Sequence, residues 1–174
     1  ILAVSCCGPK DGEYVFRVLT TNDVHGRYFD SLYVEAGVRN SLMTAAWTVD
    51  SVRTAAGKEN VLLVDVGDFL QGDNAAYYYN FVDTTSRHIF ARMAEYMDYD
   101  AVIVGNHDVE TGHAAYDRLR SQLDMPFLAA NAIRTDNGKA YFQEYTIVRR
   151  HGLKIAIVGF TNPGIPGWLS PELW

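Results

Sequence analysis

The stretch AVIVGNHDVETGH, residues 101–113, sets an apolar run directly before Gly105, Asn106, His107 and Asp108. A turn after a strand needs only the glycine or the asparagine. The imidazole and the carboxylate therefore require a chemical explanation. Two other stretches have the same form, TTNDVHG at 20–26 and VDVGDFLQGD at 64–73. Together the three predict a site built from polar residues at the ends of strands.

These stretches belong to a wider alternation of strands and helices. The segments with the apolar character of strands are 14–20, 61–66, 101–104, 126–130, 141–150 and 154–160. Apolar residues recur at spacings of three or four over 34–52, 89–97 and 116–123, which predicts helices. The sequence RRHGLK at 149–154 predicts a hairpin turn. This order indicates an α/β domain with a largely parallel sheet.

Composition narrows the class of protein. The chain has 174 residues, 48% of them hydrophobic and 21% charged, as expected for one globular domain. A formal net charge of −6 argues against long nucleic acid as a partner, because binding to phosphates needs clustered Lys and Arg. It does not argue against a small phosphorylated ligand held by metal ions. The chain contains no apolar run long enough to span a membrane as a helix.

The first residues, ILAVSCCG, resemble the end of a bacterial lipoprotein signal. We interpret residues 1–7 as a signal or lipoprotein tail, with lipid attached to Cys6 or Cys7. This predicts a protein of the bacterial cell envelope, periplasmic or at the surface and anchored by lipid. A plain secretory tail and an ordinary buried first strand remain the alternatives.

The residues at the strand ends are suited to binding metal ions. Asp23 and His25 are two positions apart, so in an extended segment both side chains can reach one ion. Asp68 offers a carboxylate that can bridge two ions. Asn106 adds a neutral amide oxygen, and this set of ligands suits Mn²⁺, Zn²⁺ or Fe²⁺. His107 is placed to protonate a leaving oxygen or to stabilise developing charge.

Each motif alone also has an ordinary structural interpretation. An Asp-x-His sequence often lies on a surface turn, a Gly-Asn pair often only marks a turn, and Asp68 could cap a helix. The metal interpretation rests on the three motifs together, each at the end of a strand.

The three motifs together resemble those of a known enzyme family. NDVHG, GDFLQG and GNHDVE resemble the first three sequence blocks of the calcineurin-like metallophosphoesterases. They are most similar to the secreted bacterial 5′-nucleotidase and 2′,3′-cyclic-nucleotide phosphodiesterase group. The resemblance implies a four-layer α/β/β/α sandwich, with Asp23 and His25 on one metal ion, Asp68 bridging two, and Asn106 on the second.

The same resemblance implies the catalytic roles. His107 would act on the phosphoryl group. Glu110 occupies the position where the family commonly has an aspartate that supports this histidine, so it is one methylene longer. The implied reaction is hydrolysis of a nucleotide phosphoester, by in-line attack of hydroxide held at two divalent metal ions. The choice between monoester and cyclic diester stays open, and a related sulfur-oxidising branch is not excluded.

The resemblance also implies what this chain lacks. Residues 8–174 correspond to the N-terminal part of the catalytic domain. The later histidine, the Gly-His-x-His block and the nucleotide-binding C-terminal domain have no counterpart. The chain alone is therefore expected to bind metal weakly and to be weakly active or inactive. The alternative function is a non-catalytic envelope lipoprotein that binds metal or nucleotide.

Other noticeable residues are predicted to have lesser roles. His88 is expected to be structural and His151 solvated. His113 is a candidate to contact a metal-binding residue without binding the metal itself. For the aromatic stretch AAYYYNF at 75–81, core packing is preferred over stacking on a nucleobase.

Overall fold

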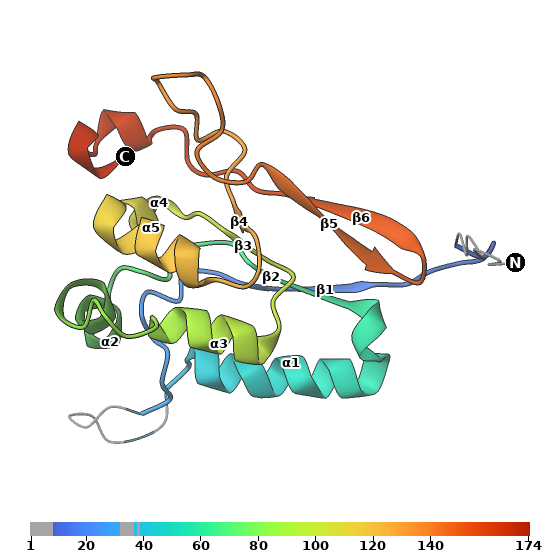
Figure 1. Ribbon diagram of the computed structural model, residues 1–174. Helices are drawn as coiled ribbons and strands as arrows, with labels where there is room; N and C mark the ends of the chain where they lie inside the picture. Colours follow the sequence, from blue (N-terminus) through green and yellow to red (C-terminus); the bar gives the residue numbers. More distant parts are fainter. Residues whose placement is uncertain (1–8, 32–36, 38) are drawn as a thin grey trace, which may run out of the picture.

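The computed structural model describes residues 9–31, 37 and 39–174, which form layers of helices and strands (Figure 1). The main sheet is parallel in the order β1-β2-β3-β4, with β1 (Arg17–Thr21), β2 (Val61–Asp65), β3 (Ala101–Ile103) and β4 (Phe127–Leu128). An antiparallel hairpin follows, made of β5 (Tyr145–Arg150) and β6 (Leu153–Val158). Every expected strand is present, most of them with narrower bounds.

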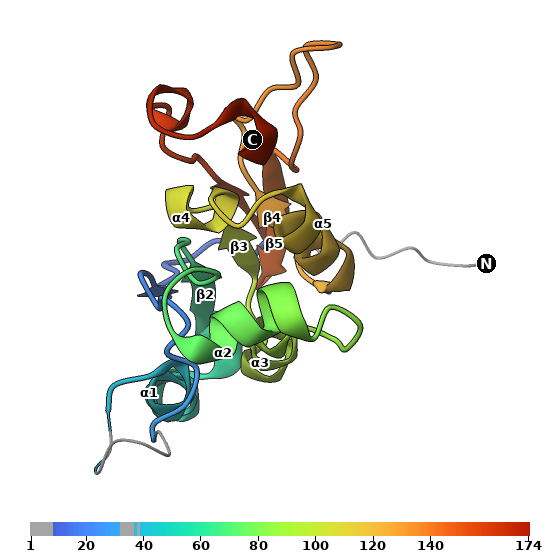
Figure 2. The ribbon, with the colours of Figure 1, turned by 90° about the vertical axis from the view of Figure 1, so that its left-hand side faces the viewer.

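The helices complete the architecture. The longer ones are α1 (Leu42–Ala56), α3 (Ile89–Met97) and α5 (His113–Gln122). Two short helices, α2 (Asn74–Tyr77) and α4 (Asn106–Val109), lie at the edge of the sheet where the parallel strands end (Figures 1 and 2). A π-helical turn, Tyr78–Val82, extends α2. Single 3₁₀ turns cover Lys58–Asn60, Ile165–Gly167 and Pro171–Leu173.

The alternation of side chains along the strands separates the two faces of the main sheet. Leu63 and Val102 point into the core shared with α1, α3 and α5. Their neighbours Val64 and Ala101 join a second cluster, against which Ile157 of β6 packs. The described residues thus form a helical layer, a parallel sheet and a hairpin layer. This is the α/β class expected, and it supplies part of the four-layer sandwich.

The first long helix begins later than its apolar pattern predicts. Ser41 caps α1: its hydroxyl accepts from the Thr44 N–H at 3.2 Å, and the Thr44 hydroxyl accepts from the Ser41 N–H at 2.9 Å. This reciprocal capping fixes the start of the helix at Leu42. Val34 and Val38, at the beginning of the expected pattern, lie outside the described residues.

The tyrosine-rich stretch does not pack as expected. Tyr77, Tyr78 and Phe81 are 61%, 48% and 51% exposed, so the prediction that its aromatics belong to the core is wrong. The residues buried instead are Ala76 and Asn80, and the Asn80 side-chain amide donates to the Leu70 carbonyl at 2.6 Å. The π-helical turn changes the helical phase, and with it the face that each side chain occupies.

His88 is structural, as predicted, and it acts as a helix cap. It is 1% exposed, and its Nδ1 accepts from the Phe90 N–H at 3.1 Å at the start of α3. The proton must then reside on Nε2, which donates to Asn80 Oδ1 at 3.1 Å. Burial, with a smaller effect of the Arg118 charge, lowers the pKa of His88 to about 3.

This pKa predicts loss of stability in mild acid. Between pH 6.5 and 3 the unfolded chain protonates His88 and the folded chain does not, so the free energy of unfolding falls as pH falls. From pH 8 to 5 the His88 contribution should be about 2 kcal/mol. In His88→Gln the decline should be smaller by that amount, measured by urea unfolding at both pH values. An equal decline in both proteins would mean that His88 is already charged in the folded state.

The hairpin turn lies where RRHGLK predicts it. His151 and Gly152 have φ of 51° and 81° and connect β5 to β6. His151 is exposed, as expected, although its Nε2 also meets Asn60 Oδ1 at 2.7 Å. The proposed lipoprotein tail, including Cys6 and Cys7, lies outside the described residues. Within the described part, no helix is long and apolar enough to cross a membrane.

Candidate metal centre

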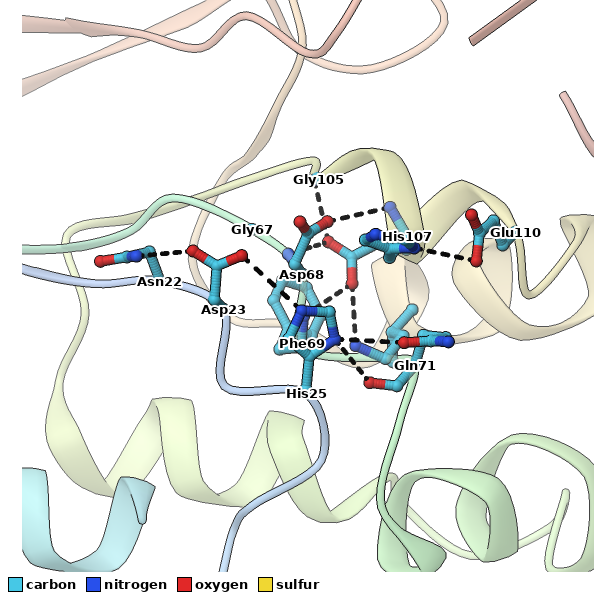
Figure 3. A network of polar contacts seen from close by, with 12 residues as sticks. Asn22, Asp23, His25, Gly67, Asp68, Phe69, Gln71, Gly105, His107 and Glu110 are labelled. Atoms are coloured by element: carbon cyan, nitrogen blue, oxygen red, sulfur yellow. Dashed lines mark hydrogen bonds and ion pairs between the residues drawn. The ribbon is translucent and has the colours of Figure 1, made fainter. Parts of the chain in front are cut away.

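Three polar side chains from two loops converge at the carboxyl ends of the parallel strands (Figure 3). Asp23 and His25 follow β1, and Asp68 follows β2. Each offers one ligand atom, and these atoms lie within 4.8 Å of one another. Two carboxylates and an imidazole at this separation fit a divalent cation of the Mn²⁺, Zn²⁺ or Fe²⁺ type.

The backbone that brings them together is not extended, so the reason given for pairing Asp23 with His25 was wrong. Their φ angles are 52° and 46°, and that of Asp68 is 62°, all in the left-handed region. The Asp23 N–H donates to the Gly67 carbonyl at 3.1 Å, and the His25 N–H donates to the Asp68 carbonyl at 2.8 Å. Non-glycine residues in this region are uncommon and gather at functional sites.

Gln71 orients the His25 ring through contacts to its Nδ1 atom. The His25 Nδ1 lies 3.1 Å from both the backbone carbonyl and the side-chain Oε1 of Gln71. Both partners are acceptors, so Nδ1 carries the proton and Nε2 presents a lone pair. Nε2 lies 3.6 Å from Asp23 Oδ1. Metal-binding histidines in proteins usually have this support for the other ring nitrogen.

Asp68 connects the ends of β2 and β3. Its Oδ1 accepts from the His107 N–H at 2.9 Å. Gly105 lies so close that a Cβ there would be 2.2 Å from the Asp68 backbone nitrogen, so only glycine fits. Asn106, between Gly105 and His107, is thereby brought to the same edge of the sheet as the first residue of α4.

A buried carboxylate beneath the group organises its loops. Asp108 is 0% exposed, and its two oxygens accept the backbone N–H groups of Asp68, Phe69, Leu70 and Gly105 at 2.8–3.0 Å. Burial raises the pKa of Asp108 to about 6, and the four hydrogen bonds oppose that rise. The strand-end motif GNHD thus contributes its aspartate to the framework of the site.

Asp65 plays a similar part at the end of β2. It is 0% exposed, accepts from the Thr21 hydroxyl at 2.5 Å, and accepts from the Gly67 N–H at 2.9 Å. The Thr21 hydroxyl also meets the Tyr99 hydroxyl at 2.7 Å. Burial raises the pKa of Asp65 to about 7. Sequence reasoning assigned no role to Asp65, Asp108 or Gln71, although an acidic residue inside an apolar run was a signal for Asp65.

His107 and Glu110 form an ion pair next to the metal-binding group. Their Nδ1 and Oε2 atoms lie 2.9 Å apart across one turn of helical backbone. The interaction with Glu110 raises the pKa of His107. The centroids of the His107 and His25 rings are 5.3 Å apart, so His107 borders the group. The extra methylene of Glu110 does not prevent the pairing.

This geometry agrees with comparisons to known proteins. The model of the calcineurin-like phosphoesterase family matches residues 16–165. The chain belongs to the calcineurin-like phosphoesterase family. The matched region contains the whole of the polar group just described.

The relatives are much longer than this chain. Protein UshA of Salmonella pullorum is 31% identical over 165 residues, which are 94% of this chain and 28% of the relative. The 5′-nucleotidase of Vibrio parahaemolyticus is 28% identical over 162 residues, 93% of this chain and 28% of the relative. The crystal structure of calcineurin-like phosphoesterase YfkN from Bacillus subtilis superimposes with a TM-score of 0.72 at 26% identity, over 87% of this chain and 49% of that chain.

Not every expected site residue joins the group. His113 does not support it from behind, because its Nδ1 is engaged with Tyr116, Asp117 and Tyr141 instead. The proposed assignments of Asp23, His25, Asp68 and Asn106 to individual metal ions, and of His107 and Glu110 to catalysis, stay predictions.

Proposed function

We propose that this protein is a metal-dependent hydrolase of nucleotide phosphoesters. One observation carries the proposal: Asp23, His25 and Asp68 converge beside the paired His107 and Glu110. Family membership and the 5′-nucleotidases among the relatives support the reaction class and the nucleotide substrate.

We assign Asp23 and His25 to one divalent ion, Asp68 to a position between two ions, and Asn106 to the second. Such ions, when bound, neutralise phosphoryl oxygens and make water a stronger nucleophile. The aspartate carboxylates would neutralise only part of the positive charge of the metal ions. The remaining positive charge would attract a phosphate dianion. Mn²⁺, Zn²⁺ and Fe²⁺ are the metals that this set of ligands favours.

The chain's own residues supply the proton chemistry. His107 holds a proton next to the position of the phosphoryl group and gives it to the leaving oxygen. Glu110 orients the imidazole and favours its protonated form. The Asp108 carboxylate fixes the loop that carries Asp68, so that these groups meet without rearrangement.

His107→Ala tests the catalytic assignment. With Mn²⁺ present, phosphate release from a nucleoside 5′-monophosphate should fall about 10²–10⁴-fold, the usual contribution of a general acid. Opening of a 2′,3′-cyclic nucleotide, measured in parallel, decides between the monoester and the cyclic diester. His151→Ala, on the remote hairpin turn, is the matched control. Unchanged turnover in His107→Ala would remove His107 from the mechanism.

The assay is best run on both the 174-residue chain and the protein encoded by the complete reading frame. We expect the shorter protein to turn over little, since the described residues offer few ligands for a second ion. Metal binding without turnover in the complete protein would instead favour the non-catalytic alternative. An envelope location with lipid on Cys6 or Cys7 is a separate proposal, tested by incorporation of labelled palmitate into the wild type and a double Cys→Ser variant.

A further inference from the structure

The last residues of β1 and β2 face each other where two of the metal-binding loops leave the sheet. Thr21 and Asp65 are partners in the parallel register, and each ends its strand. Asp23 follows Thr21 by two positions, and Asp68 follows Asp65 by three. Contacts between Thr21 and Asp65 therefore act at the base of both loops.

A path of hydrogen bonds runs from the Thr21 side chain to the backbone of Asp23. The Thr21 hydroxyl donates to Oδ2 of the buried Asp65 at 2.5 Å, and the other oxygen, Oδ1, accepts from the Gly67 N–H at 2.9 Å. The Gly67 carbonyl in turn accepts from the Asp23 N–H at 3.1 Å, and these two residues lie next to each other in Figure 3. The Asp65 carboxylate thus joins the end of β1 to the residue that holds the Asp23 backbone.

The direction of the hydroxyl protons makes Thr21 the donor to this carboxylate. Burial raises the pKa of Asp65 to about 7, so at pH 8 its carboxylate is mainly ionised and can only accept. Thr21 has one hydroxyl proton and gives it to Asp65, so the Tyr99 hydroxyl, 2.7 Å from Thr21 Oγ1, is the donor in that second contact. Within the described part of the chain, Asp65 Oδ2 has no other donor.

Asp23 depends on such support because of its backbone conformation. Its φ is 52°, and a non-glycine residue stays in this region only where its surroundings hold it. The Asp23 side chain is 60% exposed, so little packing fixes its position. The placement of its carboxylate therefore depends on the backbone hydrogen bond to Gly67.

We propose that the Thr21 hydroxyl is a positioning group for the metal-binding side chain of Asp23. It acts through Asp65 and Gly67, not by binding the ion itself. Without the hydroxyl, a buried carboxylate oxygen would lose its donor, and Asp65 could find another partner only by moving. Such a movement would pass through Gly67 to Asp23, and metal–ligand distances vary by only about 0.2 Å. The inference rests on the assignment of Asp23 to a metal ion in the proposed function.

Thr21→Val and Thr21→Ser form the decisive pair, because valine has nearly the shape of threonine without the hydroxyl and serine keeps the hydroxyl. Mn²⁺ binding to the 174-residue chain at pH 8 is measured from the EPR signal of free Mn²⁺. Thr21→Val should weaken binding about tenfold, the lower end of the usual effect of residues that support a metal ligand. Thr21→Ser should bind Mn²⁺ as the wild type does.

Two further variants separate positioning from general stability. Tyr99→Phe removes the other hydroxyl of the network but leaves the Thr21 donor in place, and Val49→Ala removes core volume at α1 without removing a hydroxyl. Both should lower the thermal unfolding temperature and keep the Mn²⁺ affinity of the wild type. A loss of affinity in either that equals the loss in Thr21→Val would mean that binding follows stability, which would contradict the proposal.

Asp23→Asn distinguishes this inference from the proposed function. If Asp23→Asn weakens Mn²⁺ binding and Thr21→Val does not, the positioning role is refuted and the metal centre stands. If Thr21→Ser loses as much affinity as Thr21→Val, the hydroxyl is not the responsible group and the inference is refuted. Absence of Mn²⁺ binding by the wild type would overturn both the metal centre and the inference.

Discussion

Replacing Asp108 by asparagine should lower the free energy of unfolding by about 3 kcal/mol or more, the usual cost of breaking a buried charged network. The side chain is fully buried, and each carboxylate oxygen accepts two backbone N–H groups. Asparagine keeps one acceptor oxygen and sets an amide nitrogen, itself a donor, against two donors. The loops that carry Asp68 and Gly105 would lose their common anchor.

Urea unfolding at pH 7 measures the effect. Asp50→Asn, an identical change of side chain at an exposed position on α1, is the matched control and should lie within about 0.5 kcal/mol of the wild type. If Asp108→Asn also lies within that margin, the four hydrogen bonds do not organise the site.

The second large effect is expected for Asp68→Asn, on metal binding and activity together. Loss of a residue that merely supports a metal ligand costs about 10–100-fold in affinity, so loss of a carboxylate that we propose to bind the metal directly should cost at least about 100-fold. The asparagine oxygen can still accept from the His107 N–H, which Asp68 Oδ1 does at 2.9 Å, so the fold should persist. Under the proposed assignment of Asp68 to a position between two ions, hydrolysis should fall in parallel with metal binding.

Calorimetric titration with Mn²⁺ gives the affinity. Asp73→Asn is the control, because it removes the same charge at a residue outside the metal-binding group. Asp73 lies at the far end of the same loop, where it caps α2 and pairs with Arg39 at 2.6 Å. Undiminished Mn²⁺ affinity in Asp68→Asn would exclude Asp68 as a ligand.

The sequence predicted which residues would meet because the topology of a parallel sheet brings strand ends to one edge. Motifs after three strands therefore implied a single site, and Asp23, His25 and Asp68 do converge. The local geometry could not be foreseen in the same way. The left-handed conformations of Asp23 and His25 depend on hydrogen bonds to Gly67 and Asp68, more than 40 positions away.

The residues that support the site were harder to predict. Asp108 was part of the quoted motif, but its role depends on backbone N–H groups of another loop, which leave no local pattern. The exposure of Tyr77 and Phe81 follows from a π-helical turn that residue spacing does not signal. Strands and helices were predictable from apolar periodicity. Capping and buried polar contacts were seen only in the three-dimensional structure.

The most direct test of the metal centre is anomalous diffraction from crystals of this chain grown with Mn²⁺. The account predicts an anomalous peak about 2.0–2.5 Å from ligand atoms of Asp23, His25 and Asp68, at the edge where β1 and β2 end. A peak elsewhere, or none at this group under saturating Mn²⁺, would contradict the account.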